Sequence, residues 1–148
     1  MLRHSTPVLF RHPSPHVGRR DLRRFLKDLA QEILPEQGLA CLITSDAELR
    51  ELNRKFRGKD YPTDVLSFPP DDIAISFDRA AAQAAELSHS VEDELRILML
   101  HGLLHLAGMD HDADAGAMAR AEARWRKRLG LPCGLIERAK TSRVKASA

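Results

Sequence analysis

Residues 97–111 read ILMLHGLLHLAGMDH, and we expect the rest of the chain to be organised around this stretch. His101 and His105 are four positions apart, so in a helix their side chains lie on one face. Gly108 can take the left-handed conformation that ends a helix, and His111 can then return toward that face. Three imidazoles around one point, with a fourth direction open, are typical of a catalytic zinc ion. The stretch therefore predicts a metal site built on a helix.

The helix that carries this pair has a start signal of its own. Ser90 is followed by an acidic residue three positions on, Asp93, in a pattern related to the capping box. From Ile97 to Ala107 the sequence is apolar nearly all round, which predicts a buried central helix rather than a surface one. An unpaired buried polar group costs about 1–3 kcal/mol. Two histidines in such a helix need partners, and a shared metal would satisfy both.

The competing interpretation is that these histidines belong to the core. A lone histidine on an apolar helix is more often a hydrogen-bonded core residue than a ligand. The i, i+4 pair followed by a glycine turn and a third histidine favours the metal. His12 and His16 have the same spacing, but the prolines between them exclude a helix interior. We expect those two and His4 to lie in an N-terminal loop or edge, and His89 to be solvated ahead of a helix.

Length and composition predict one globular domain. The chain has 148 residues, 43% apolar and 30% charged, and we expect a single domain over residues 1–138 with a disordered basic tail over 139–148. Cys41 and Cys133 have no metal-binding spacing and indicate a reduced, cytoplasmic protein. The longest uncharged, mostly apolar run, residues 97–109, is too short to span a bilayer. The N-terminus lacks the apolar core of a secretion signal.

The net charge of +2 is unevenly distributed. Residues 61–117 carry 2 Lys or Arg against 11 Asp or Glu, whereas residues 118–148 carry 9 against 2. The acidic middle surrounds the proposed metal site, and the basic ends can supply a phosphate-binding rim. The alternative is that the C-terminal arginines form one solvated helix face and a tail. The charge pattern alone favours that simpler interpretation.

Hydrophobic periodicity and turn residues predict an α/β fold. We expect a small mixed sheet of about four strands, one antiparallel, covered by about five helices, with the metal site on a buried central helix. Pro69 and Pro70 end one short strand, and a second follows closely, as in a hairpin. The expected strands are Val8–Phe10, Leu39–Ile43, Val65–Phe68 and Ile73–Ser76. The expected helices are Arg19–Leu34, Ser45–Arg57, Asp78–Leu87, the histidine helix and Asp114–Leu129.

Two of these helices carry clear inward-facing patterns. Ser45 and Glu48 form a capping box, and Gly58 ends the helix that they open. The residues of this helix expected to face inward are Leu49, Leu52 and Phe56. The last helix is expected to pack through Met118, Ala121, Trp125 and Leu129, and Gly130 and Pro132 end it.

A three-histidine zinc predicts hydrolysis, because the ion lowers the pKa of its bound water to about 7 and acts as a Lewis acid. Zinc peptidases place a glutamate after the first histidine as general base, and here that position is Gly102. A phosphodiester fits better, since its cleavage asks mainly for charge neutralisation, which an arginine supplies in bidentate form. Arg57, in a polar loop after a helix, is the candidate, although position alone does not separate it from Arg54. The chain has no P-loop, GxGxxG or GxSxG motif.

Two long blocks of the sequence resemble one known family. HGLLHLAGMDH at residues 101–111 resembles the signature of the YbeY-type endoribonucleases, which are bacterial ribosomal-RNA maturation factors. LNRKFRGKD at 52–60 and PTDVLSFP at 62–69 match a second family block, and DIAIS at 72–76 resembles a third. Two positions depart from the family pattern. Met109 stands where the family usually has tyrosine, and Asp71 where it usually has glycine.

The resemblance implies a single-strand-specific, metal-dependent endoribonuclease that acts in ribosomal RNA processing, notably of the small-subunit RNA 3′ end, and in ribosome quality control. It implies one Zn²⁺ per chain on His101, His105 and His111, and a catalytic role for Arg57. Single-stranded RNA, ribosomal RNA and the small ribosomal subunit are the implied partners. The family's fold, a small mixed sheet covered by helices, agrees with the expected elements.

The mechanism and two alternatives stay open at this point. Zinc either activates water or polarises the phosphoryl oxygen while Arg57 stabilises developing charge, and the RNA 2′-hydroxyl is an alternative nucleophile. Asp64, Asp72 and Asp110 are weak candidates for the general base, since each also fits a carboxylate that orients a ligand. One alternative is a non-enzymatic ribosome-associated factor whose zinc is structural. The other is a metallopeptidase that takes its acid from elsewhere.

Overall fold

The computed structural model describes residues 8–13, 17–36, 38–110 and 115–138. The strands are β1 (Val8–Phe10), β2 (Ala40–Thr44), β3 (Val65–Phe68) and β4 (Asp72–Ser76). The helices are α1 (Arg19–Ile33), α2 (Asp46–Arg57), α3 (Phe77–Leu87), α4 (Val91–Leu106) and α5 (Ala117–Leu129). These elements confirm the predicted α/β class, with four strands in one mixed sheet. The predicted tail, residues 139–148, lies outside the described residues.

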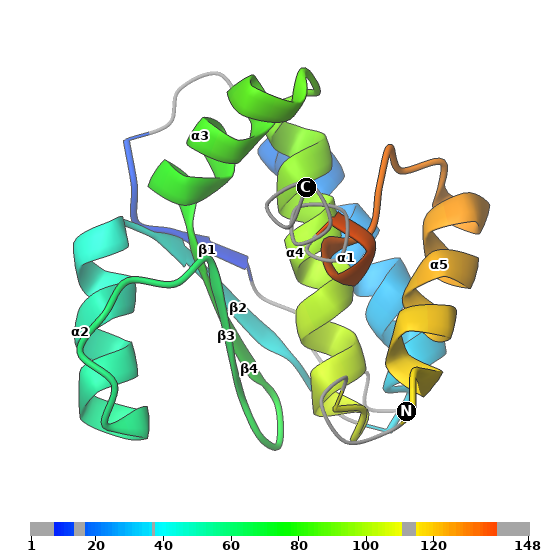
Figure 1. The fold of residues 1–148 in the computed structure, drawn as a ribbon, viewed down its shortest axis with the longest axis horizontal. Coiled ribbons are helices and arrows are strands. Elements are labelled where there is room, and N and C mark those ends of the chain that lie inside the picture. The colour runs from blue at the N-terminus through cyan, green and yellow to red at the C-terminus, as the bar shows by residue number, and fades with distance from the viewer. Residues whose placement is uncertain (1–7, 14–16, 37, 111–114, 139–148) are drawn as a thin grey trace, which may run out of the picture.

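The sheet has the strand order β1-β2-β4-β3. β1, β2 and β4 are parallel, and β3 pairs antiparallel with β4, as the Pro69-Pro70 hairpin signal predicted. Side chains alternate between the two faces of a strand. Ile43 and Ile75 therefore pack into the main core, whereas Leu66 and Ala74 pack with Leu49 of α2. In Figure 1, α2 covers one face of the sheet, and α4, α1 and α5 lie on the other.

The histidine-bearing helix α4 is the central helix that the sequence predicts. The Ser90 hydroxyl accepts a hydrogen bond from the Asp93 N–H at 3.1 Å, which caps the first turn. Most side chains from Glu94 to Leu104 are buried, because the helix packs against the sheet and against α1, α3 and α5. Gly108 has φ +94°, the left-handed conformation expected of the residue that turns the chain after this helix.

Several element boundaries differ from those expected. α1 ends at Ile33, one residue early, β2 is shifted one residue onward, and α3 begins at Phe77 instead of Asp78. These are shifts of the size that hydrogen-bond criteria alone produce at the ends of elements. The last helix begins at Ala117, three residues later than expected, after Gly116 with φ +88°. Asp114 lies outside the described residues.

Two expectations about side-chain burial are wrong. Phe56 is 60% exposed, because its ring meets Phe68 at the edge of two hollows and is not packed into the core. His89 is not solvated: its side chain is only 9% exposed, and Nε2 lies 2.6 Å from the buried Glu94 carboxylate. His12 does lie in a loop, where Nε2 is 2.8 Å from Asp78 Oδ1. His4 and His16 lie outside the described residues.

Both cysteines are free thiols. Burial raises the pKa of Cys41 to about 12, so its thiol is uncharged and unreactive at neutral pH. In the part of the chain that the structure describes, no helix combines the length and apolar character needed to cross a bilayer.

Candidate active site

The two histidines of α4 converge on one point. His101 Nε2 and His105 Nε2 lie 3.1 Å apart, and the two ring planes are nearly perpendicular. This follows from the helix itself, because residues i and i+4 lie one above the other on the same face. The predicted convergence of this pair is confirmed. His111, the third predicted ligand, lies outside the described residues.

A buried carboxylate that the sequence analysis did not identify orients the first histidine. Glu122 of α5 is 2% exposed, and its Oε2 lies 2.8 Å from His101 Nδ1. An ionised carboxylate only accepts hydrogen bonds, so Nδ1 carries the proton and the Nε2 lone pair faces His105. One feature of the sequence could have pointed to Glu122. Glu122 is four residues after Met118 and lies on the inward face of an amphipathic helix, where an acid has to be partnered.

The C-terminal segment fixes that carboxylate in turn. The Ile136 N–H donates to Glu122 Oε1 at 2.8 Å. Gly134 allows this close approach, since a Cβ there would lie 2.6 Å from the same oxygen. Three segments distant in sequence thus meet at the Glu122 carboxylate: α4, α5 and residues 134–136.

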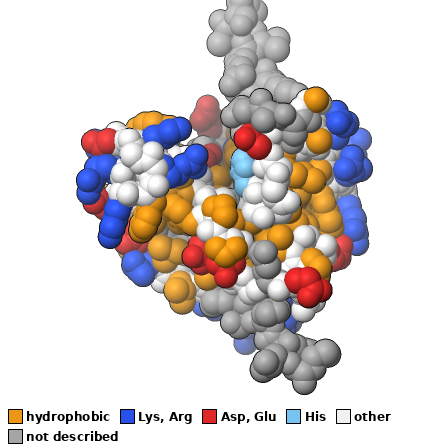
Figure 2. Space-filling view, turned by 90° about the horizontal axis from the view of Figure 1, so that it is seen from below, with side chains coloured by type: hydrophobic (Ala, Val, Ile, Leu, Met, Phe, Trp, Pro, Cys, Tyr) orange, Lys and Arg blue, Asp and Glu red, His pale blue; other side chains and the backbone are white. Residues whose placement is uncertain are grey.

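One cleft joins this pair to the predicted arginine. Its volume is about 740 Å³, and it lies where α2 and α4 both end. Figure 2 looks into this end of the molecule and shows a histidine in a hollow, with Lys and Arg side chains on the α2 side and again along the opposite edge. We call it the histidine cleft; its lining includes Arg57, Asp64, Phe68, His101, His105, Met109 and Asp110.

The structure distinguishes Arg57 from Arg54, which their positions in the sequence could not do. Arg57 lines the cleft, whereas the Arg54 guanidinium pairs with Glu51 one turn earlier on α2. Both belong to the last turn of α2, which Gly58 ends with φ +68°. The structure therefore brings Arg57 to the same cleft as the two histidines.

The three candidate bases divide between two sites. Asp64 and Asp110 line the histidine cleft, as does Met109, one of the two departures from the family pattern. Asp72 lines a different hollow, on the α2 face of the sheet. Burial, and to a smaller extent the neighbouring Asp71 charge, raises the pKa of the Asp72 carboxyl. Among the three, only Asp64 and Asp110 remain candidates for work beside the histidines.

Gly102 faces the sheet rather than the cleft. A Cβ at this position would lie 3.0 Å from Ile73 Cδ1, and the Gly102 carbonyl accepts a hydrogen bond from Ser67 Oγ at 3.1 Å. A glutamate there would have to displace Ile73 from the core. The place where a zinc peptidase carries its base is therefore closed by packing.

The donor set fits a divalent metal. Two nitrogen ligands on a tetrahedral zinc at about 2.0–2.1 Å are separated by about 3.3 Å, close to the 3.1 Å between the two Nε2 atoms. A carboxylate on the far nitrogen of a ligating histidine is also a regular feature of metal sites. Within the described ranges, the pair is not joined by a third His, Cys, Asp or Glu into a set of three ligands.

Comparison with known proteins identifies the family. A sequence model of the family described as "Endoribonuclease YbeY" matches residues 16–130 of this chain. The chain belongs to the YbeY endoribonuclease family. The matched range contains every predicted site residue: Arg57, His101, His105 and His111.

Individual YbeY relatives support the same assignment. Endoribonuclease YbeY of Solibacter usitatus is 54% identical over 136 residues, covering 88% of this chain and 92% of the relative. Endoribonuclease YbeY of Koribacter versatilis is 54% identical over 112 residues, covering 72% and 74%. The solution structure of TM1509 from Thermotoga maritima has a TM-score of 0.55 at 27% identity, covering 82% of this chain and 93% of that one. RNA is thus the substrate class of this YbeY chain.

Proposed function

We propose that this chain is a zinc-dependent, single-strand-specific endoribonuclease of ribosomal RNA maturation. It acts on the 3′ end of the small-subunit RNA and in ribosome quality control, in the cytoplasm. The observation that carries the proposal is one cleft that holds two convergent imidazole nitrogens and an arginine. Metal on one side and a guanidinium on the other are the charges that a phosphodiester needs.

His101 and His105 would hold the ion, with His111 as the third ligand, one Zn²⁺ per chain. When bound, the ion supplies a Lewis acid and a water with a pKa of about 7. Glu122 favours the His101 tautomer with the proton on Nδ1, the form whose Nε2 can ligate a metal. The buried Glu122 carboxylate also receives a backbone N–H in place of a guanidinium. A cation at Nε2 would therefore balance its charge.

Arg57 acts on the phosphate itself. Its guanidinium, at the cleft wall opposite α4, neutralises charge that develops on the phosphoryl oxygens. Asp64 and Asp110 are the carboxylates placed to take the nucleophile's proton. If the RNA 2′-hydroxyl attacks, a 2′-O–P bond forms, the P–O5′ bond breaks, and the products are a 2′,3′-cyclic phosphate and a 5′-hydroxyl. Attack by water leaves no cyclic end, so the product ends identify the nucleophile.

The test combines metal analysis with cleavage of single-stranded RNA. We expect one zinc per chain by elemental analysis, and cleavage that a chelator abolishes and added zinc restores. Zinc without cleavage of RNA, free or on the small subunit, would favour a binding factor with a structural ion. Absence of any bound divalent metal would overturn the site.

Arg57 and Arg54 form a matched pair for testing the catalytic role. We expect Arg57→Ala to keep its zinc and its fold and to lower kcat about 10²–10³-fold, the loss typical of removing one charge-stabilising donor. Arg54→Ala, one turn away and paired with Glu51, should cleave at nearly the wild-type rate. Equal activity in the two variants would show that the role assigned to Arg57 is wrong. His111→Ala should lose zinc.

A further inference from the structure

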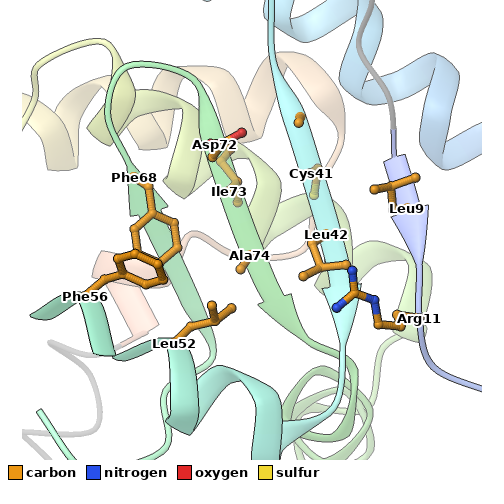
Figure 3. A pocket seen from close by; sticks show the side chains of 11 residues that line it. Leu9, Arg11, Cys41, Leu42, Leu52, Phe56, Phe68, Asp72, Ile73 and Ala74 are labelled. Atoms are coloured by element: carbon orange, nitrogen blue, oxygen red, sulfur yellow. The ribbon is translucent and has the colours of Figure 1, made fainter. Parts of the chain in front are cut away.

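A second hollow lies on the face of the sheet that α2 covers only in part. Its volume is about 380 Å³ and its walls are mainly apolar. Figure 3 shows the Phe56 and Phe68 rings against each other at one side, with Leu52 beside them and Leu42 and Arg11 across the hollow. We call it the apolar hollow. Leu9 at its far side is 55% exposed and Phe56 is 60% exposed, an apolar surface of the kind that marks a binding site.

The apolar hollow adjoins the histidine cleft. Phe56 and Phe68 line both. Their ring centroids are 5.6 Å apart and the rings meet edge to face at 69°. Phe56 lies in the last turn of α2 and Phe68 is the last residue of β3. This aromatic pair therefore stands between the two depressions, and a chain leaving the histidine cleft on this side passes over it.

Positive charge accompanies this path. Lys55 Nζ lies 5.5 Å from the centre of the Phe56 ring, and Arg57 follows in the wall of the histidine cleft. An exposed ring flanked by cations is the combination with which proteins hold single-stranded nucleic acid, because bases stack on the ring and phosphates lie beside the charges.

Resting on the proposed endoribonuclease function, we propose that Phe56 is a base-stacking platform for single-stranded RNA. The apolar hollow then receives the neighbouring base, while the scissile phosphate lies in the histidine cleft. The sugar-phosphate backbone follows Lys55 and Arg57. The hollow suits a base better than a phosphate, since its walls are mainly apolar. Of the two charged side chains that line it, Asp72 would repel a phosphate, and Arg11 is already paired with Glu48 at 3.0 Å.

This arrangement explains why the enzyme would require an unpaired RNA strand. A base inside a duplex is stacked on its neighbours and offers no free face to Phe56. Only a strand whose bases are splayed out can place one base on the ring and the next in the hollow. Strand selectivity then resides in the aromatic pair, outside the metal and arginine chemistry.

The test uses the full-length chain with a fluorescein-labelled single-stranded RNA decamer. Affinity is measured by anisotropy in chelator, where the strand stays intact, and KM and kcat are measured with the zinc-loaded enzyme. We expect Phe56→Ala to weaken binding and raise KM about tenfold, within the range of one lost base stack, with kcat within about twofold. Tyr61→Ala is the matched control, because Tyr61 is 51% exposed yet lines neither depression; it should bind normally.

Charged substitutions of opposite sign at Leu9 test whether RNA enters the apolar hollow. Leu9→Glu places a negative charge at the far wall and should weaken RNA binding several-fold, whereas Leu9→Lys should bind as well as the wild type or better. If both changes leave RNA binding untouched, the hollow is not part of the path. It then belongs to another occupant, such as a protein segment or a second copy of this chain.

The outcomes separate this inference from the proposed function. Wild-type protein that binds and cleaves RNA, together with a Phe56→Ala variant equal to it, overturns the stacking platform and leaves the nuclease standing. Wild-type protein that neither binds the decamer nor cleaves RNA overturns both. Circular dichroism and thermal melting of each variant show that the fold is retained, which the exposure of Phe56 and Leu9 leads us to expect.

Discussion

Two buried histidine–carboxylate pairs occur among the residues that the structure describes, one near each end of α4. At the start of the helix, His89 Nε2 lies 2.6 Å from Glu94 Oε1. Near its end, His101 Nδ1 lies 2.8 Å from Glu122 Oε2. Both carboxylates are almost completely buried. On composition and distance alone the two pairs are equivalent.

They differ in what else holds each carboxylate. Glu94 receives two hydrogen bonds from the Arg138 guanidinium, at 2.9 and 3.0 Å, so its charge is balanced inside the protein. Glu122 receives the neutral Ile136 N–H, and the second nitrogen of its histidine faces His105 in the cleft. The first pair ties the C-terminal segment to the helix. The second carboxylate has no guanidinium among the partners that the described residues give it, and the histidine that it orients lines the histidine cleft beside His105.

The largest effect is expected from breaking the structural pair. Glu94→Gln removes the charge that Arg138 faces, and loss of one partner of a buried ion pair costs about 3–5 kcal/mol. We expect the free energy of unfolding in urea to fall by about 3 kcal/mol. Zinc affinity of the remaining folded protein should be unchanged. Glu32→Gln, which breaks the exposed pair with Arg128, should change stability by less than about 1 kcal/mol.

For the His101–Glu122 pair in the cleft, we expect the main effect on zinc affinity instead of on stability. Glu122→Gln keeps an acceptor for His101 but sets a second donor against the Ile136 N–H. Loss of a carboxylate that orients a metal ligand typically lowers affinity 10–100-fold. We expect zinc affinity, measured by competition with a chromogenic chelator, to fall within that range. A variant that binds zinc as tightly as the wild type would remove Glu122 from the metal site.

The sequence predicted the features that local interactions determine. Ser45 and Ser90 cap their helices through the predicted residues three positions on, and Gly58 and Gly130 end helices with positive φ. His101 and His105 converge because four residues of helix bring them together. In each case the information lies within one or two turns of chain.

The failures depend on partners that are distant in sequence. Phe56 has the helical spacing of a core residue, but in the fold its ring meets Phe68 of β3 at the edge of two hollows. His89 pairs with Glu94 only five residues on, but Glu94 is in turn held by Arg138, 44 residues further along the chain. Glu122 lies 21 residues from the histidine that it orients. No local pattern contains the position of those partners, so side-chain roles of this kind require the fold.

A smaller effect on the cleft is expected from Gly134→Ala. The new Cβ would lie 2.6 Å from Glu122 Oε1, so the carboxylate has to shift away from Ile136 N and His101. Overpacking of this kind costs about 1–3 kcal/mol. We expect zinc affinity to fall about fivefold, less than in Glu122→Gln because the carboxylate is retained. Gly18→Ala, whose Cβ would meet no atom closer than 3.7 Å, is the control and should bind zinc normally.

The smallest effect is expected at His89. Glutamine can still donate a hydrogen bond to Glu94 from its side-chain amide, so His89→Gln preserves what this histidine does in a structural pair. We expect a loss below about 1 kcal/mol in urea unfolding, the net worth of one hydrogen bond, and zinc content equal to that of the wild type. His89→Ala removes the donor as well and should lose more stability, again with full zinc. Loss of zinc in either variant would mean that the two histidine–carboxylate pairs are coupled along α4, and the contrast between a structural and a metal-facing pair would fail.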